Sequence, residues 1–333
     1  MIFKDIRVIA ITCLSLVLLW SCASKQATLR NEAEQGDLEK VRKLVAEGTG
    51  VNEKDSNNST PLMFASQAGH VDVVTFLLQN GASVNSKNDA GFTALSCATE
   101  KFHINVAKIL LQNGADINNQ SSTGATVLMR ALYQGNNDVV RFLIQNGADV
   151  NLADSKGFRP LWIPVFKDDL DMVKFLIGQG ARVDVESNNG TTPLMSAAFG
   201  SSKVFSFLME KGPDINKLTK EGFSALTCAA IGAGDISKDF DPSIMQRLIN
   251  AGVSASIKDI NGKSIIELAE LEAKRLEYNR IKQNNKDQEP RKLDQNFSGL
   301  ATALVDLTIT YPVANAKIAD RIKKIKEVLD SRP

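Results

Sequence analysis

Histidine is scarce in this chain: it occurs twice, as His70 and His103. The two residues are 33 positions apart, so they occupy the same place in adjacent copies of the repeat described below. Helices of neighbouring copies stack about 8–10 Å apart, whereas each ligand of a zinc ion lies about 2 Å from the metal. A shared ion would need large distortion, and we therefore expect no metal site.

Other signatures of catalysis are also missing. The sequence has no zinc-type pair of cysteines, and no spacing of Ser, His and Asp singles out a triad. Gly232 and Gly234 lack the preceding strand that a phosphate-binding loop needs. We therefore expect no enzyme activity and no cofactor. One alternative stays open, an unfamiliar active region within residues 270–333, although that segment has no histidine and no cysteine.

Cysteine is nearly as rare, with four residues in 333. Cys97 and Cys228 occupy equivalent positions four repeats apart, which stacking separates by roughly 40 Å. A disulfide needs Cα atoms within about 7 Å of each other, so we expect both residues to be free thiols. The net charge of +1 gives no indication of a nucleic-acid partner.

What the sequence does have is an internal repeat. Thr60–Asn85 reads TPLMFASQAGHVDVVTFLLQNGASVN, and Thr93–Asn118 reads TALSCATEKFHINVAKILLQNGADIN. Leucines mark the 33-residue period: Leu62, Leu95, Leu128, Leu161 and Leu194. A fixed period of this length indicates one supersecondary unit that is stacked many times.

Each copy predicts a pair of helices. Thr60 can cap the first helix, whose first turn accepts Pro61, and Gly69 ends that helix. Asp72 suits the positive end of the second helix. Gly81 stands where its C-terminus needs a left-handed residue. Apolar residues at helical spacing form the buried stripe of each helix.

The period, with the signatures T-P-L-x-x-A and L-L-x-x-G-A-x-x-N, resembles the ankyrin repeat. The resemblance implies an all-α solenoid of stacked helix pairs with β-hairpin finger loops. This array covers residues 27–269 in about seven to eight repeats, the first of which is a polar cap. His70 and His103 match the family's Gly-His position, which implies a structural role for both.

The pattern changes in the fifth repeat, from Arg159 to Asp184. Pro164 replaces a core alanine there, and an internal proline is expected to kink a helix because it removes a hydrogen bond. Trp162 and Phe166 lie beside it, and Tyr133 lies one repeat earlier. These aromatic residues form either a binding patch or a core that repacks around Pro164, and the sequence leaves both interpretations open.

The N-terminus is typical of a targeting segment. Lys4 and Arg7 precede a short apolar run that ends in Ser21-Cys22. The ending resembles a bacterial lipoprotein processing box. It implies a signal peptide at residues 1–21, lipidation of Cys22 and a tether at 22–26. We expect a lipid-anchored envelope protein, facing the periplasm or on the outer membrane rather than the inner membrane. Ordinary cleavage near Ala23 is the alternative.

The repeat period fails after Ala269. Residues 270–333 contain a charged segment and then a predicted amphipathic helix with Ile318, Ile322, Ile325 and Leu329 on one face. We interpret this helical C-terminal extension as a possible cap that packs on the last repeat. A basic helix on a membrane or a partner is the alternative.

The family resemblance implies protein binding through the concave face of the repeats. The candidate contact residues on the inner helices are Phe64, Arg130, Tyr133, Trp162, Ile163 and Phe166. Those on the fingers are Lys87, Asp89, Asp154, Lys156, Glu186 and Lys220. We expect a monomeric interaction module with a protein partner, held at the membrane by its lipid. A structural tether for an envelope component is the alternative function.

Overall fold

The computed structural model describes residues 29–200, 202–232, 242–271, 273 and 312–330. The chain forms two compact units, an N-terminal unit, Met1–Ser155, and a C-terminal unit, Lys156–Pro333. The expected signal peptide, tether and Cys22 lie outside the described residues. No helix among the described residues is both long and apolar enough to span a membrane.

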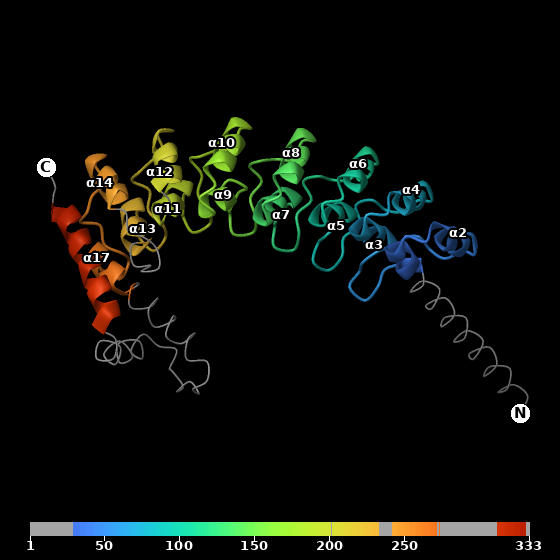
Figure 1. Ribbon diagram of the computed structural model, residues 1–333, viewed down its shortest axis with the longest axis horizontal. Helices are drawn as coiled ribbons and strands as arrows, with labels where there is room; N and C mark the ends of the chain where they lie inside the picture. Colours follow the sequence, from blue (N-terminus) through green and yellow to red (C-terminus); the bar gives the residue numbers. More distant parts are fainter. Residues whose placement is uncertain (1–28, 201, 233–241, 272, 274–311, 331–333) are drawn as a thin grey trace, which may run out of the picture. The chain divides into compact units, whose positions relative to one another are not determined.

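Both units consist of helix pairs, as the repeat predicts (Figure 1). The first helices of repeats two to seven are α3 (Pro61–Ala68), α5 (Ala94–Glu100), α7 (Val127–Gln134), α9 (Trp162–Phe166), α11 (Pro193–Ala198) and α13 (Ala225–Gly232). The second helices of repeats one to seven are α2 (Leu38–Ala46), α4 (Val71–Gln79), α6 (Ile104–Gln112), α8 (Asn137–Gln145), α10 (Leu170–Gly178), α12 (Ser202–Met209) and α14 (Ser243–Asn250). Residues 29–35 and 265–271 are also helical.

Threonine caps start most first helices. The Thr60 side chain accepts a hydrogen bond from the N–H of Met63, and Pro61 follows in the first turn. Thr93, at the same place in the next repeat, forms a capping box with Ser96. These bonds satisfy backbone N–H groups that have no partner within the helix. The sequence therefore fixes the start of the helix locally, before any repeat stacks on another.

The core is built from the residues that keep the period. Leu62, Leu95 and Leu128 are buried in the N-terminal unit, and Leu161 and Leu194 are buried in the C-terminal unit. Small residues beside them, such as Ala65 and Ala98, are also buried and let first helices of adjacent repeats pack closely: α3 on α5, and α11 on α13. Each repeat thus buries its apolar face only against its neighbours.

Asparagine side chains join adjacent repeats in the N-terminal unit. Asn85 donates from Nδ2 to the carbonyl of Gly114 at 2.9 Å and accepts from the N–H of Asp116 at 2.8 Å. Asn52 makes the same two bonds one repeat earlier, to Gly81 and Ser83. Each amide satisfies backbone groups at the end of the next second helix, which fixes the step between repeats.

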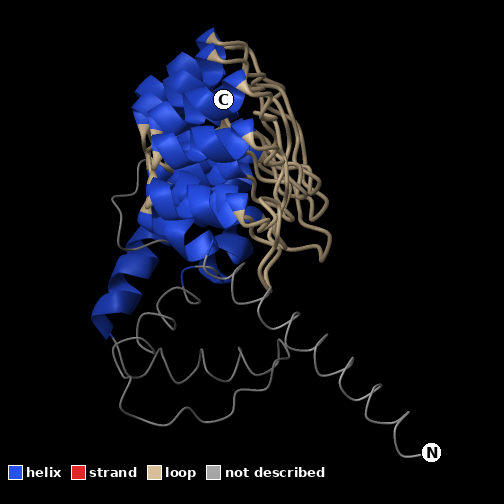
Figure 2. Ribbon diagram, turned by 90° about the vertical axis from the view of Figure 1, so that its right-hand side faces the viewer, coloured by secondary structure: helices blue, strands red, loops and turns tan. Residues whose placement is uncertain are grey.

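Within each unit, the finger loops lie on one side of the helices (Figure 2). Each finger is a tight turn: the N–H of Asn88, for example, donates to the carbonyl of Phe92 at 3.0 Å. Successive fingers are also joined, since Asp89 donates from its N–H to Asn57 at 3.0 Å. The described fingers contain isolated bridges, such as Gln120 with Thr126, but no strand. The expected β-hairpins are therefore reduced to hairpin turns.

Pro164 acts at the start of its helix rather than in the interior. α9 begins at Trp162, so Pro164 falls in the first turn, where a missing N–H is tolerated. Arg159 stands at the position of the capping threonines, and no side chain caps the helix. The prediction of a kink inside the helix is therefore wrong. The fifth repeat instead has a short first helix of five residues that no side chain caps.

The last described helix, α17 (Pro312–Asp330), packs on α14. Three of the residues expected on its apolar face, Ile322, Ile325 and Leu329, are buried. The side chain of Ile318 lies outside the described residues. Exposed ion pairs on the opposite face join Lys324 to Asp320 and Lys323 to Glu327. The helix therefore packs its apolar stripe on the second helix of the seventh repeat.

Candidate binding surface

In the N-terminal unit, α5 and α7 carry a cluster of charged and aromatic groups. Arg130 of α7 forms an ion pair with Glu100 of α5, with 2.7 Å between Nη2 and Oε2. The guanidinium of Arg130 also lies 4.3 Å from the centroid of the Phe92 ring. Both contacts hold the Arg130 side chain in one orientation. Tyr133, one turn further along α7, is 76% exposed.

In the C-terminal unit, aromatic rings gather around the short helix α9. Phe158 meets Trp162 edge to face at a centroid distance of 5.7 Å and meets Phe166 at 6.3 Å. Phe166 is 63% exposed. Phe199, at the end of the adjacent helix α11, is 43% exposed and stands 33 residues after Phe166. The same repeat position is thus aromatic and exposed on both helices. The leucines five residues earlier, Leu161 and Leu194, are buried.

Trp162 is a core residue. It is 1% exposed, so its side chain is not available to a partner. This corrects its assignment as a contact residue and separates the two interpretations that the sequence left open. Trp162 supports the fold from within, whereas Phe166 and Tyr133 are exposed and can make contacts. The other inner-helix candidates, Phe64 and Ile163, are half-buried.

The finger candidates divide by what they contact. Lys87, Lys156 and Lys220 are exposed. Asp89 is exposed too, but it accepts a hydrogen bond from Nδ2 of Asn58 in the preceding finger at 2.6 Å. Glu186 forms an ion pair with Lys217, with 2.6 Å between Nζ and Oε1. Asp154 is half-buried. The two acids Asp89 and Glu186 therefore also stabilise neighbouring fingers.

Sequence reasoning missed two exposed aromatic residues, Phe199 and Phe102. The signal for Phe199 was present, because it lies one repeat after Phe166. Phe102 is 48% exposed and has a φ of 64°. It stands where Gly69 and Gly135 end the equivalent helices with positive φ. Its conformation is uncommon for a bulky side chain, and that conformation is visible only in the structure.

The histidines contact the preceding repeat. Nε2 of His70 lies 2.9 Å from the carbonyl oxygen of Glu34, and Nε2 of His103 lies 3.1 Å from that of Gln67. Since a carbonyl only accepts, each imidazole donates here. The rings also lie over glycine: a Cβ added at Gly69 would be 2.6 Å from the His103 ring. Both histidines therefore have the structural role that the family resemblance implies.

Cys97 and Cys228 are free thiols, as the repeat spacing predicts. Burial raises the pKa of Cys97 to about 11, with a smaller contribution from the charge of Glu100. Burial also raises the pKa of Cys228 to about 12. Both thiols stay protonated at neutral pH, so neither has the character of a nucleophile. Among the described residues, no three His, Cys, Asp or Glu side chains come together as a metal site would require.

Comparison with known families agrees with this architecture. A family model described as Ankyrin repeats (3 copies) matches residues 29–121, 118–187 and 161–259, which together span more than half of the chain. No curated protein matches it. The stacked helix pairs, the capping threonines and the finger turns lie within the matched residues. The chain belongs to the ankyrin-repeat family.

Proposed function

We propose that this protein is a non-enzymatic interaction module that binds a protein partner through its first helices and fingers. Ankyrin repeats are in general protein–protein interaction modules. The observation that carries the proposal for this chain is one repeat position, which holds Tyr133, Phe166 and Phe199 in three successive repeats. All three side chains are exposed, although each follows a buried leucine of the repeat, Leu128, Leu161 or Leu194.

Exposed aromatic rings at a repeated position are the kind of groups that anchor interfaces. Tryptophan, tyrosine and arginine are enriched among the few residues that dominate binding energy at protein interfaces, and an aromatic ring buries a large apolar area. Arg130 adds a guanidinium that is already oriented by Glu100 and Phe92. A partner that covers such groups on either unit gains apolar contact without reorganising the fold of that unit.

A pull-down tests the binding proposal. The chain lacking residues 1–21 is used as bait in extracts of the envelope of its own cells, beside a variant with Tyr133→Ala and Phe166→Ala. We expect the wild-type bait to enrich a protein that the double variant does not retain. Equal recovery by both baits would argue against the aromatic surface and move attention to the fingers.

We also propose that the protein is exported and anchored to the bacterial envelope by a lipid on Cys22, facing the periplasm or on the outer membrane. The support is the sequence of the N-terminus: two basic residues, a short apolar run and a small residue before cysteine. A lipid at this point would hold the repeats close to a membrane and raise the effective concentration of a partner there.

Replacement of the lipidated residue tests the anchor. Cys22→Ala is expected to release the protein from membranes or to leave it unprocessed, because no thiol remains for lipid attachment. Cys13→Ala is the control and leaves both processing and membrane attachment unchanged. Normal maturation and membrane association of Cys22→Ala would refute lipidation at this residue.

A further inference from the structure

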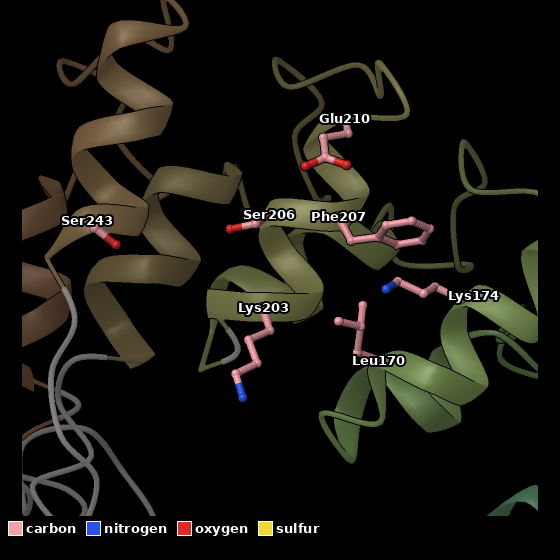
Figure 3. A pocket seen from close by; sticks show the side chains of 7 residues that line it. All are labelled: Leu170, Lys174, Lys203, Ser206, Phe207, Glu210 and Ser243. Atoms are coloured by element: carbon pink, nitrogen blue, oxygen red, sulfur yellow. The ribbon is translucent and has the colours of Figure 1, made fainter.

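The second helices of the C-terminal unit enclose a groove that the proposed function does not use. It lies between α10, α12 and α14, and its cavity volume is about 480 Å³ (Figure 3). The candidate binding surface is formed by first helices and fingers, whereas this groove is formed by second helices. A ligand here would therefore bind a separate surface of the same unit.

The groove has an apolar floor. Leu170 of α10 and Phe207 of α12 are both half-buried and point into it (Figure 3). Nζ of Lys174 lies 5.6 Å from the centroid of the Phe207 ring, and Nζ of Lys211 lies 4.9 Å from it. The ring is therefore flanked by two cations, and an apolar side chain can rest between Phe207 and Leu170 within reach of positive charge.

The first turn of α12 reverses the charge found in four of the equivalent second helices, whereas α6 and α14 have no acid in their first turns. Glu39, Asp72, Asp138 and Asp171 stand in the first turns of α2, α4, α8 and α10. The equivalent residue of α12 is Lys203, and this helix has no acid in its first turn. A cation is unfavourable there, because the N-terminal end of a helix is itself positive. Lys203 does not stabilise the N-terminal end of α12. An anionic ligand in the groove, in contrast, would be stabilised by Lys203.

The charges that face the groove are mostly positive. Lys174 and Lys203 line it together with one carboxylate, Glu210. Arg247 of α14 stands nearby, where its guanidinium donates to the hydroxyl of Ser206. Within the described part of the chain, neither Lys174 nor Lys203 forms an ion pair with a carboxylate.

We propose that this groove binds an acidic peptide segment of a partner protein. The segment places an apolar side chain on Leu170 and Phe207 and carboxylates beside Lys174 and Lys203. An anionic membrane surface fits less well, because such surfaces are recognised by clusters of about four to eight basic residues. This groove offers two lining lysines and an apolar floor formed by Leu170 and Phe207.

Fluorescence anisotropy with the purified full chain tests the proposal. The probe is a short labelled peptide in which aspartate alternates with leucine. One control peptide replaces aspartate with lysine, and another replaces leucine with serine. We expect binding of the first peptide only, and affinity that falls as salt is added. Lys203→Glu, which gives α12 the acidic first turn of α2, α4, α8 and α10, weakens binding about tenfold or more.

Matched variants separate the groove from general electrostatics. Lys220→Glu makes the same charge change on an exposed finger of the same unit and leaves binding unchanged. Phe166→Ala, on the candidate binding surface, also leaves binding of the peptide unchanged. A failure of the groove proposal can therefore be distinguished from a failure of the proposed function. The proposal is overturned if the aspartate–leucine peptide does not bind, if the aspartate–serine peptide binds equally well, or if Lys220→Glu costs as much as Lys203→Glu. Binding to anionic phosphatidylglycerol vesicles, but not to the peptide, would overturn it in favour of a membrane.

Discussion

At the scale of single residues, the repeats differ in the residue that ends each first helix. Gly36, Gly69 and Gly135 end their helices with positive φ. At Gly36 and Gly69 the next repeat also places a histidine ring where a Cβ would lie. The histidines that lie over Gly36 and Gly69 come 34 residues later in the chain. The residue 34 positions after Phe102 is Asn136, not histidine. A side chain at residue 102 is therefore sterically possible, and what remains is the backbone strain of a φ of 64°.

Phe102→Gly is predicted to stabilise the N-terminal unit. Glycine adopts positive φ without strain, which recovers about 1–2 kcal/mol, while its greater freedom in the unfolded chain returns about 0.5–1 kcal/mol. We expect the free energy of unfolding to rise by roughly 0.5–1 kcal/mol, measured by urea denaturation. Asp168→Gly, at a φ of 55°, is the comparison and should gain less, because Asp tolerates this region better. A loss of stability in Phe102→Gly would mean that its ring makes contacts worth more than the strain.

The two thiols give a prediction that depends on pH. Because burial raises the pKa of Cys97 from 9.0 to about 11, the thiol stays protonated up to that pH in the folded chain. Iodoacetamide should label neither Cys97 nor Cys228 in the folded protein at pH 8, and should label both in urea. Raising the pH from 9 towards 11 should lower the free energy of unfolding, since the unfolded thiol ionises first. Rapid labelling of the native protein at pH 8 would contradict the raised pKa values of the two half-buried thiols.

At the scale of elements, the helices that follow the period were predictable and the exception was not. Thr60 and Gly69 bracket α3 by local rules that hold in any context. In the fifth repeat the same rules give only part of the answer. Proline at residue 164 signalled a disturbed helix, but its place within the first turn depends on where α9 begins, and that is decided by packing around Trp162.

Arg159→Thr is predicted to restore the missing cap of α9. The new hydroxyl can accept from the N–H of Trp162, as Thr60 does from Met63. A cap contributes about 1 kcal/mol to the free energy of unfolding. The substitution also removes the hydrogen bond from Arg159 to the carbonyl of Glu186, and the contribution of that bond is lost. We therefore expect the free energy of unfolding of the C-terminal unit to rise by roughly 0.5 kcal/mol.

Tryptophan fluorescence can follow this change locally. The chain has two tryptophans, Trp20 and Trp162. With Trp20→Phe in the background, Trp162 is the single probe and reports on the fifth repeat. Arg159→Ala is the control, because it removes the bond to Glu186 without adding a cap. If Arg159→Thr unfolds at the same urea concentration as Arg159→Ala, the hydroxyl does not cap α9.

At the scale of the whole molecule, the period predicted the architecture but only part of the surface. Leucines recur at fixed spacing together with the capping threonines and the glycines, so the fold could be predicted from the sequence. Exposure is set by neighbouring repeats, so the sequence could not distinguish buried Trp162 from exposed Phe166 four residues later. The groove between α10, α12 and α14 could not be predicted from the sequence either, because its lining residues come from three repeats.

The central claim is that Tyr133 and Phe166 bind the partner and do not hold the fold together. The most direct test measures the affinity of the captured partner and the melting temperature for the chain with Tyr133→Ala and Phe166→Ala, beside Val71→Ala as an exposed apolar control on a second helix. We predict that the double variant loses about 2 kcal/mol or more of binding free energy, with a melting temperature close to that of the wild type. Full affinity in the double variant, or a melting temperature lowered as the loss of buried aromatic rings would lower it, would contradict the account.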